Sequence, residues 1–295
     1  MSICEIQGLT RDYGKGHGIF DVSFSIEQGE IFGFLGPNGS GKTTTIRHLM
    51  GFLKPAKGSC TIDGMDCWKN SADIQNNLGY IPGEMAFFDD MTGMEFLSFM
   101  AKYRKMKTAG RTKELLERFE LDAQANLKKM SKGMKQKVGI VAAFMHDPDV
   151  FILDEPTSGL DPLMQSRFVE LVLEEKARGK TILMSSHMFE EVERTCHRVA
   201  IIKDGRLVAT DSVDALKAAQ IKKYVITLES EESASAFANE GLQISAVLEN
   251  HVTVIVQNDI KKLISVMNLY PVTNIFAPNQ SLEEIFMQYY GGGKS

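Results

Sequence analysis

The chain has 295 residues, 43% of them hydrophobic and 24% charged, which is ordinary for a globular protein with a sizeable core. Its net charge of −5 argues against binding nucleic acid over a broad surface, which usually needs a basic face, so we expect no nucleic-acid partner. No apolar run approaches the length of a membrane-spanning helix, so we expect the chain not to span a membrane. The four cysteines lack the spacing of a metal site, so we expect them to be reduced cytosolic thiols.

Strands and helices alternate through the chain up to about residue 215. The apolar run at 31–35 ends at a glycine, Gly36, as a buried strand that feeds a loop does. Such alternation predicts an α/β fold with a mainly parallel sheet covered by helices. We expect strands at 3–9, 19–26, 31–35, 58–64, 150–153, 181–184 and 198–202, and helices at 43–50, 162–177 and 188–195.

A helical segment interrupts this alternation at about 85–147. Thr92 is a suitable N-cap for a helix at 95–106, which carries apolar residues at helical spacing. Further helices are expected at 112–119 and 131–144. We therefore predict a helical subdomain inserted into the α/β domain.

The composition shifts again at 215–222, so we predict one domain over 1–218 and a small accessory domain over 219–295. The second domain has the order β-α-β-β-α-β, which is typical of a ferredoxin-like α+β fold. Its strands are expected at 223–228, 243–248, 251–256 and 272–276, its helices at 231–239 and 260–269, and a last helix at 281–290.

A phosphate-binding loop follows the strand at 31–35. Residues 36–43 read GPNGSGKT and match G-x-x-x-x-G-K-[ST] between a strand and a helix, a context that disfavours a merely structural turn. Backbone N–H groups and the helix N-terminus attract phosphate, Lys42 adds a charge, and the Thr43 hydroxyl suits Mg²⁺. The predicted nucleotide-binding residues are Gly36, Asn38, Gly39, Ser40, Gly41, Lys42, Thr43 and Thr44.

Three segments in order resemble the ATP-binding cassette (ABC) ATPases: the phosphate loop, the Ser131-Lys132-Gly133 run, and Asp154-Glu155 at a strand end. In this family the Ser-x-Gly run is the signature motif, and it contacts the ATP that a second subunit holds. The resemblance implies a P-loop NTPase fold with a mixed or parallel sheet, an antiparallel β subdomain and a helical subdomain.

The resemblance also implies a role for each residue that matches a family motif. Asp154 and Thr43 would hold Mg²⁺, and Glu155 would polarise the attacking water. Taken alone, the two carboxylates could also be caps of the loop that begins at Pro156. His187, at a strand end, matches the switch histidine that contacts the γ-phosphate. The other matches are Tyr13, which would stack on adenine, Asp161 of the D-loop, and Ser131 and Gly133, which would contact ATP in trans.

The signature departs from the commonest Leu-Ser-Gly-Gly-Gln form. Met130 replaces leucine, Lys132 the first glycine and Met134 the glutamine. Ser131 and Gly133 remain, with a hydroxyl and an N–H suited to phosphate at a helix N-terminus. The variant resembles a subgroup of bacterial exporters. Ser131 also fits an ordinary N-cap, and the two roles are compatible.

A second departure concerns the Q-loop. The family has a glutamine after a segment like 79–82, whereas this chain has Gly83 and then Glu84. Two interpretations stay open: Glu84 takes over the contact with Mg²⁺ and the attacking water, or the role is lost. Other candidates have structural explanations. Tyr13 would also suit a glycine-rich turn, and His17, His48, His146, His197 and His251 are expected to be structural.

The function implied by the resemblance is that of an ATP- and Mg²⁺-dependent ATPase subunit. It would pair with a second ATPase subunit, identical or different, and power an exporter from the cytoplasmic face of the membrane through a separate permease. Methionines and phenylalanines at 85–100 would partly form a groove for a permease helix. The alternatives are a soluble ABC ATPase that acts on ribosomes or DNA, and a non-catalytic binding module.

Overall fold

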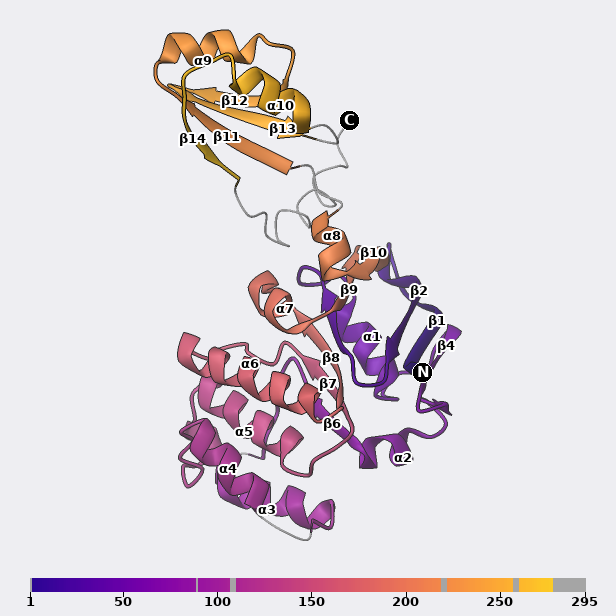
Figure 1. The fold of residues 1–295 in the computed structure, drawn as a ribbon. Coiled ribbons are helices and arrows are strands. Elements are labelled where there is room, and N and C mark those ends of the chain that lie inside the picture. The colour runs from indigo at the N-terminus through magenta and orange to yellow at the C-terminus, as the bar shows by residue number, and fades with distance from the viewer. Residues whose placement is uncertain (1, 89, 107–109, 219–221, 257–259, 278–295) are drawn as a thin grey trace. The chain divides into compact units, whose positions relative to one another are not determined.

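The computed structural model describes residues 2–88, 90–106, 110–218, 222–256 and 260–277. Two compact units divide the chain, Met1–Val213 and Asp214–Ser295. Figure 1 shows the elements of both units. In the part of the chain that the structure describes, no helix combines the length and the apolar character needed to cross a membrane.

Two sheets form the framework of the first unit. Its strands are β1 (Ser2–Gly14), β2 (His17–Glu27), β3 (Ile31–Leu35), β4 (Lys57–Ile62), β5 (Met65–Asp66), β6 (Leu78–Ile81), β7 (Val150–Asp154), β8 (Thr181–Ser186), β9 (Arg198–Lys203) and β10 (Arg206–Ser212). A four-stranded antiparallel sheet has the order β2-β1-β4-β5, and a six-stranded sheet has the order β10-β9-β3-β8-β7-β6. Only the β10–β9 pair of the larger sheet is antiparallel. The expected mixed sheet with an antiparallel subdomain is confirmed.

Helices cover both faces of the larger sheet. They are α1 (Lys42–Leu49), α2 (Ser71–Asn76), α6 (Pro162–Ala177) and α7 (Phe189–Thr195). A further helix, α8 (Val213–Ala218), begins at the boundary between the two units. Phe32 and Phe34 of β3 share a core with Ile46 of α1. Gly33, between them, faces Val192 of α7. Because successive side chains of a strand point to opposite faces, α1 and α7 lie on opposite sides of the sheet. Figure 1 shows α1 between the two sheets.

The helical segment contains α3 (Gly93–Tyr103), α4 (Gly110–Arg118) and α5 (Lys132–Phe144). Thr92 caps α3 as predicted: its Oγ1 accepts a hydrogen bond from the Glu95 N–H at 3.2 Å, and the Glu95 carboxylate accepts one from the Thr92 N–H at 2.8 Å. Phe144 of α5 stacks on Phe151 of β7 with ring centroids 4.3 Å apart. This contact anchors the segment to the sheet near the start of β7.

The second unit has the predicted ferredoxin-like order. It contains β11 (Lys222–Leu228), α9 (Glu231–Ala238), β12 (Gln243–Leu248), β13 (His251–Val256), α10 (Ile260–Met267) and β14 (Val272–Phe276). The strands form an antiparallel sheet in the order β12-β13-β11-β14. Both helices contribute to one core, in which Phe237 and Leu263 join Ile226 and Val254 of the sheet. The helix expected at 281–290 lies outside the described residues.

Candidate nucleotide-binding site

The loop between β3 and α1 folds tightly around the N-terminus of α1. Gly36 has no room for a side chain, because a Cβ atom there would lie 2.5 Å from the Ile202 carbonyl oxygen and from Ser40 Oγ. Lys42 opens α1, and its Nζ donates to the carbonyl oxygens of Gly36 at 2.6 Å and Pro37 at 3.2 Å. Loop N–H groups and a helix N-terminus together form a site for phosphate.

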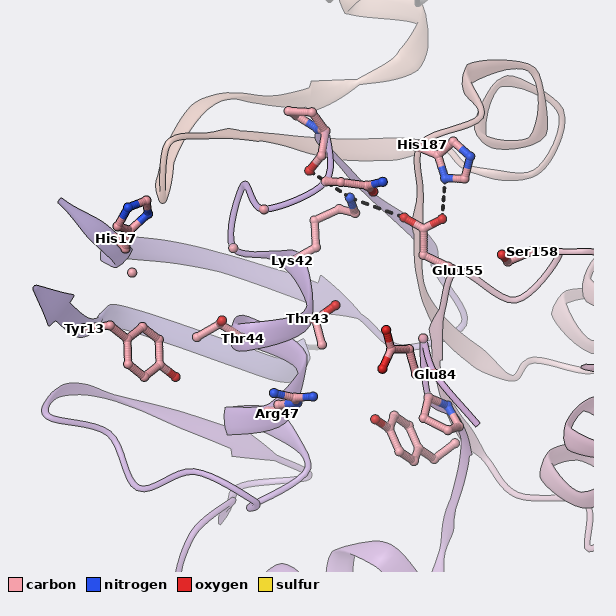
Figure 2. A pocket seen from close by; sticks show the side chains of 18 of the residues that line it. Tyr13, His17, Lys42, Thr43, Thr44, Arg47, Glu84, Glu155, Ser158 and His187 are labelled. Carbon is pink, nitrogen blue, oxygen red and sulfur yellow. Dashed lines mark hydrogen bonds and ion pairs between the residues drawn. The ribbon is translucent and has the colours of Figure 1, made fainter. Parts of the chain in front are cut away.

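A pocket of about 710 Å³ lies in front of this loop. Figure 2 shows Tyr13 and His17 at one end and Glu155, Ser158 and His187 at the other, with the start of α1 between them. The structure therefore brings together an aromatic end, a phosphate loop and an acidic end. The predicted residues that line the pocket are Tyr13, Asn38, Gly39, Gly41, Lys42, Thr43, Thr44, Glu84, Glu155 and His187. Those outside its lining are Gly36, Ser40, Ser131, Gly133, Asp154 and Asp161.

Glu155 is the centre of the acidic end. Its carboxylate lies 3.3 Å from Lys42 Nζ and contacts His187 Nδ1 (Figure 2). The Glu155 backbone is left-handed, with φ of 52°. Such a conformation costs on the order of 1–3 kcal/mol for a residue with a side chain and persists only when its surroundings hold it. The Glu155 N–H is fixed by Ser185, whose carbonyl oxygen and Oγ lie at 3.2 and 3.1 Å.

Asp154 is fully buried behind the pocket. Its Oδ1 accepts a hydrogen bond from Ser185 Oγ, whereas Oδ2 has no hydrogen-bond partner among the described residues. Gly83 leaves space beside Oδ2, because a Cβ atom there would lie 3.0 Å from that oxygen. A buried carboxylate oxygen without a donor is costly unless it faces a cation. Asp154 and the Thr43 hydroxyl are oxygen ligands of the kind that Mg²⁺ prefers.

The metal would need further oxygen ligands. Within the described ranges, no group of three or more His, Cys, Asp or Glu side chains could hold a metal ion. Mg²⁺ commonly binds through one or two protein ligands together with substrate phosphates and water. The residues present therefore fit a cation that arrives with a nucleotide.

Ser131 and Asp161 each cap a helix. Ser131 Oγ accepts a hydrogen bond from the Met134 N–H at 3.2 Å at the start of α5, so the N-cap interpretation is confirmed. Asp161 Oδ1 accepts one from the Met164 N–H at 3.0 Å at the start of α6. Both residues lie outside the lining of the pocket in their own chain.

Several residues that line the pocket were not predicted from the sequence to do so. His17 was expected to be structural, yet it lines the pocket beside Tyr13, because the β1–β2 hairpin pairs His17 with Gly14. Arg47 also lines the pocket. Its position one helical turn after Thr43 could have predicted this, because residues four apart lie on the same face of a helix. Further lining residues that sequence reasoning did not assign are Gly18, Pro37, Tyr80, Pro82, Gly83, Lys132 and Ser158.

A further carboxyl group follows His187 on the first turn of α7. Glu191 of α7 is 6% exposed and accepts a hydrogen bond from Ser186 Oγ at 2.8 Å. Burial raises the pKa of Glu191 to about 7, against the lowering effect of the Ser186 and Thr157 hydroxyls. In the sequence, only its position four residues after His187, on the first turn of a helix, indicated that Glu191 lies close to the site. Glu191 thus ties the segment before His187 to α7.

The phosphate loop, Glu155 after β7 and the histidine that follows β8 line one pocket, and Asp154 is buried behind it. This is the arrangement of a P-loop nucleoside triphosphatase. Comparison with known proteins supports this assignment. Residues 19–158 match the family model described as ABC transporter. The bacitracin transport ATP-binding protein BcrA of Bacillus licheniformis is 33% identical over 99% of this chain and 98% of its own length.

A second relative and a solved structure support the same family. The Nod factor export ATP-binding protein I of Paraburkholderia xenovorans is 37% identical over 76% of this chain and 75% of its own length. A solved structure of an ATP-binding subunit of an ABC transporter has a TM-score of 0.67 and 32% identity over 74% of this chain and 92% of its own. The chain therefore belongs to the ABC transporter family, as a subunit that binds and hydrolyses ATP.

Proposed function

We propose that this chain is the ATPase subunit of an exporter, held at the cytoplasmic face of the membrane by a separate permease. The observation that carries the proposal is the contact of Glu155 with both Lys42 and His187 at one end of the pocket. Names of relatives support export, because they refer to bacitracin transport and Nod factor export. The transported molecule would bind in the permease.

The geometry supports a mechanism in which the triphosphate of ATP lies along the phosphate loop. Tyr13 stacks on the base, and Lys42 binds the β- and γ-phosphates. Thr43 and Asp154 would hold Mg²⁺, which would supply positive charge to the phosphates when bound. Glu155 orients the attacking water and accepts its proton, while Lys42 stabilises the charge that develops on the γ-phosphate. His187 contacts the γ-phosphate from the side of Glu155.

The site of one chain is half of a complete site. Ser131 and Gly133 stand at the N-terminus of α5, where a hydroxyl and backbone N–H groups suit a phosphate. Both residues lie outside the lining of their own pocket. In our proposal they contact the ATP of a second subunit, identical or different, and Asp161 faces the same partner. Closure of the pair around two ATP molecules drives the permease, and hydrolysis reopens the pair.

Glu84→Ala is expected to lower kcat about tenfold while ATP affinity stays unchanged. Figure 2 shows the Glu84 carboxylate pointing into the pocket on the side of Thr43, and Gly83 offers no side chain beside Asp154. Glu84 is therefore our candidate for the missing Q-loop glutamine. The measurement is steady-state ATPase with the permease present, and Glu117→Ala, on the exposed surface of α4, is the control. An unchanged rate would show that Glu84 has no such role.

Phe88→Asp is expected to abolish co-purification with the permease and to leave nucleotide binding intact. Phe88 and Phe99 are 55% and 45% exposed and contact each other edge to face with centroids 6.1 Å apart. Phe87 packs on Phe96 beside them at 4.9 Å. An exposed aromatic cluster of this kind suits an amphipathic partner helix.

The partner is the membrane protein that co-purifies with the wild-type chain from detergent-solubilised membranes. Leu248→Asp, at a 70% exposed position of the second unit, is the matched control. Retention of the membrane partner by Phe88→Asp and Phe87→Asp together would place the docking surface elsewhere. Co-purification of the wild-type chain with ribosomal RNA instead of a membrane protein would favour the soluble alternative.

A further inference from the structure

The first turns of α5 hold the loop that follows Glu155. Gln136 Nε2 donates a hydrogen bond to the Pro156 carbonyl oxygen at 2.6 Å, and Gln136 is only 5% exposed. Lys132 Nζ donates to Ser158 Oγ at 2.8 Å. Two side chains from one face of a helix thus bind two positions of one short loop.

The backbones of the helix and the loop also touch. A Cβ atom on Gly133 would lie 2.7 Å from the Gly159 carbonyl oxygen, closer than real Cβ contacts come. Gly133 therefore permits an approach that any side chain would prevent. The side chain of Lys132 covers Gly159 from the other side, with its Cγ and Cδ 3.1 Å from a Cβ built there. The start of α5 and residues 156–159 form one packed unit.

This packing bears on the position of Glu155. The Pro156 carbonyl belongs to the residue directly after Glu155, whose backbone is held in the left-handed region. Such a conformation depends on neighbouring contacts, because it is unfavourable by itself. Ser185 fixes the N–H of Glu155, and Gln136 fixes the chain on its other side. The bond from Gln136 is therefore one of the contacts that aim the Glu155 carboxylate.

We propose that Gln136 and Lys132 are positioning residues that fix the loop at 156–159 to the signature helix and so set the position of Glu155. The inference rests on the proposed function, which assigns Glu155 to the attacking water and Ser131 and Gly133 to the partner's ATP. The helix that in the proposed function contacts the partner's nucleotide is thus joined to the Glu155 loop of the same chain. Lys132 contributes a bond that the glycine of the commonest signature lacks.

Gln136→Leu is expected to lower kcat at least about tenfold and to change the KM for ATP by less than about twofold, because a small displacement of a catalytic group is costly. Gln75→Leu is the matched control, since Gln75 Nε2 makes a similar bond, to the Met50 carbonyl oxygen at 2.8 Å. Lys132→Met removes an exposed side chain, which leaves folding undisturbed, and should lower kcat about threefold. Lys129→Met is its control.

Hydrogen exchange provides a readout that does not depend on activity. In Gln136→Leu without nucleotide, the amides of Glu155, Ser158 and Leu160 should exchange about tenfold faster, while amides of β3 and β8 keep their protection. Wild-type kcat and wild-type loop protection in Gln136→Leu would overturn the proposal, and so would a uniform loss of protection throughout the unit. If Glu155→Gln hydrolyses ATP normally, the proposed function fails, but the exchange data still decide whether Gln136 holds the loop.

Discussion

Replacing Glu155 with glutamine is expected to lower the ATPase rate about 100- to 1,000-fold while ATP affinity changes less than about twofold. Glutamine keeps the size of the side chain and its ability to hydrogen-bond, but it does not accept a proton from water. The substitution also removes a negative charge that lies 3.3 Å from Lys42 Nζ, so it does not weaken the attraction of the triphosphate. The substitution should therefore lower the rate of hydrolysis without lowering the affinity for ATP.

Single-turnover hydrolysis and equilibrium ATP binding, measured on the same preparation of Glu155→Gln, test this expectation. Glu170→Gln, at an exposed position of α6, is the control for loss of one carboxylate. A rate above about one tenth of wild type would assign the attacking water to another group. A rate loss accompanied by an equal loss of affinity would show that Glu155 acts in binding.

Lys42→Met is expected to weaken ATP binding about 100-fold, the equivalent of losing strong hydrogen bonds to charged phosphate. The Lys42 side chain is 5% exposed and is held by two loop carbonyl oxygens and Glu155, so its ammonium group is already oriented. Methionine preserves the length and the apolar stem, and it removes only the charge and the donors. Lys42→Met should therefore weaken ATP binding, and hydrolysis should fall as a consequence.

Equilibrium binding of Mg²⁺-ATP measures this effect, with Lys69→Met, an exposed lysine outside the pocket lining, as the control. Thermal unfolding without nucleotide checks that Lys42→Met remains folded. A Kd within about threefold of the wild-type value would mean that Lys42 serves the loop structure and contributes little to the nucleotide.

The fold and the core of the site were largely predictable, because local patterns encode them. The phosphate loop needs glycines and Lys42 at fixed spacing, and Thr92 with Glu95 forms a capping box within one turn. Helix ends that depend on tertiary contacts were less predictable. The helix expected at 95–106 ends at Tyr103, since the backbone turns left-handed at Lys105, with φ of 52°, and the Arg104 guanidinium binds the carbonyl oxygens of Gln75, Asn76 and Leu78.

Contacts between distant segments account for what the sequence did not reveal. The gap beside Asp154 Oδ2 exists because Gly83, from the end of β6, lies against β7. His17 reaches the pocket through a hairpin longer than the predicted strands. The bond from Gln136 to the Pro156 carbonyl joins a helix of the inserted segment to the end of a core strand. No periodicity or spacing in the chain specifies such pairs.

The central claim is that each chain holds half of an ATPase site, which Ser131 and Gly133 of a second chain complete. The most direct test is the ATPase rate per chain, measured at saturating ATP while the purified chain is diluted over about three orders of magnitude around the dimer dissociation constant. The shared site predicts a rate per chain that falls steeply as the subunits separate. A rate per chain that stays constant over the whole range would contradict it.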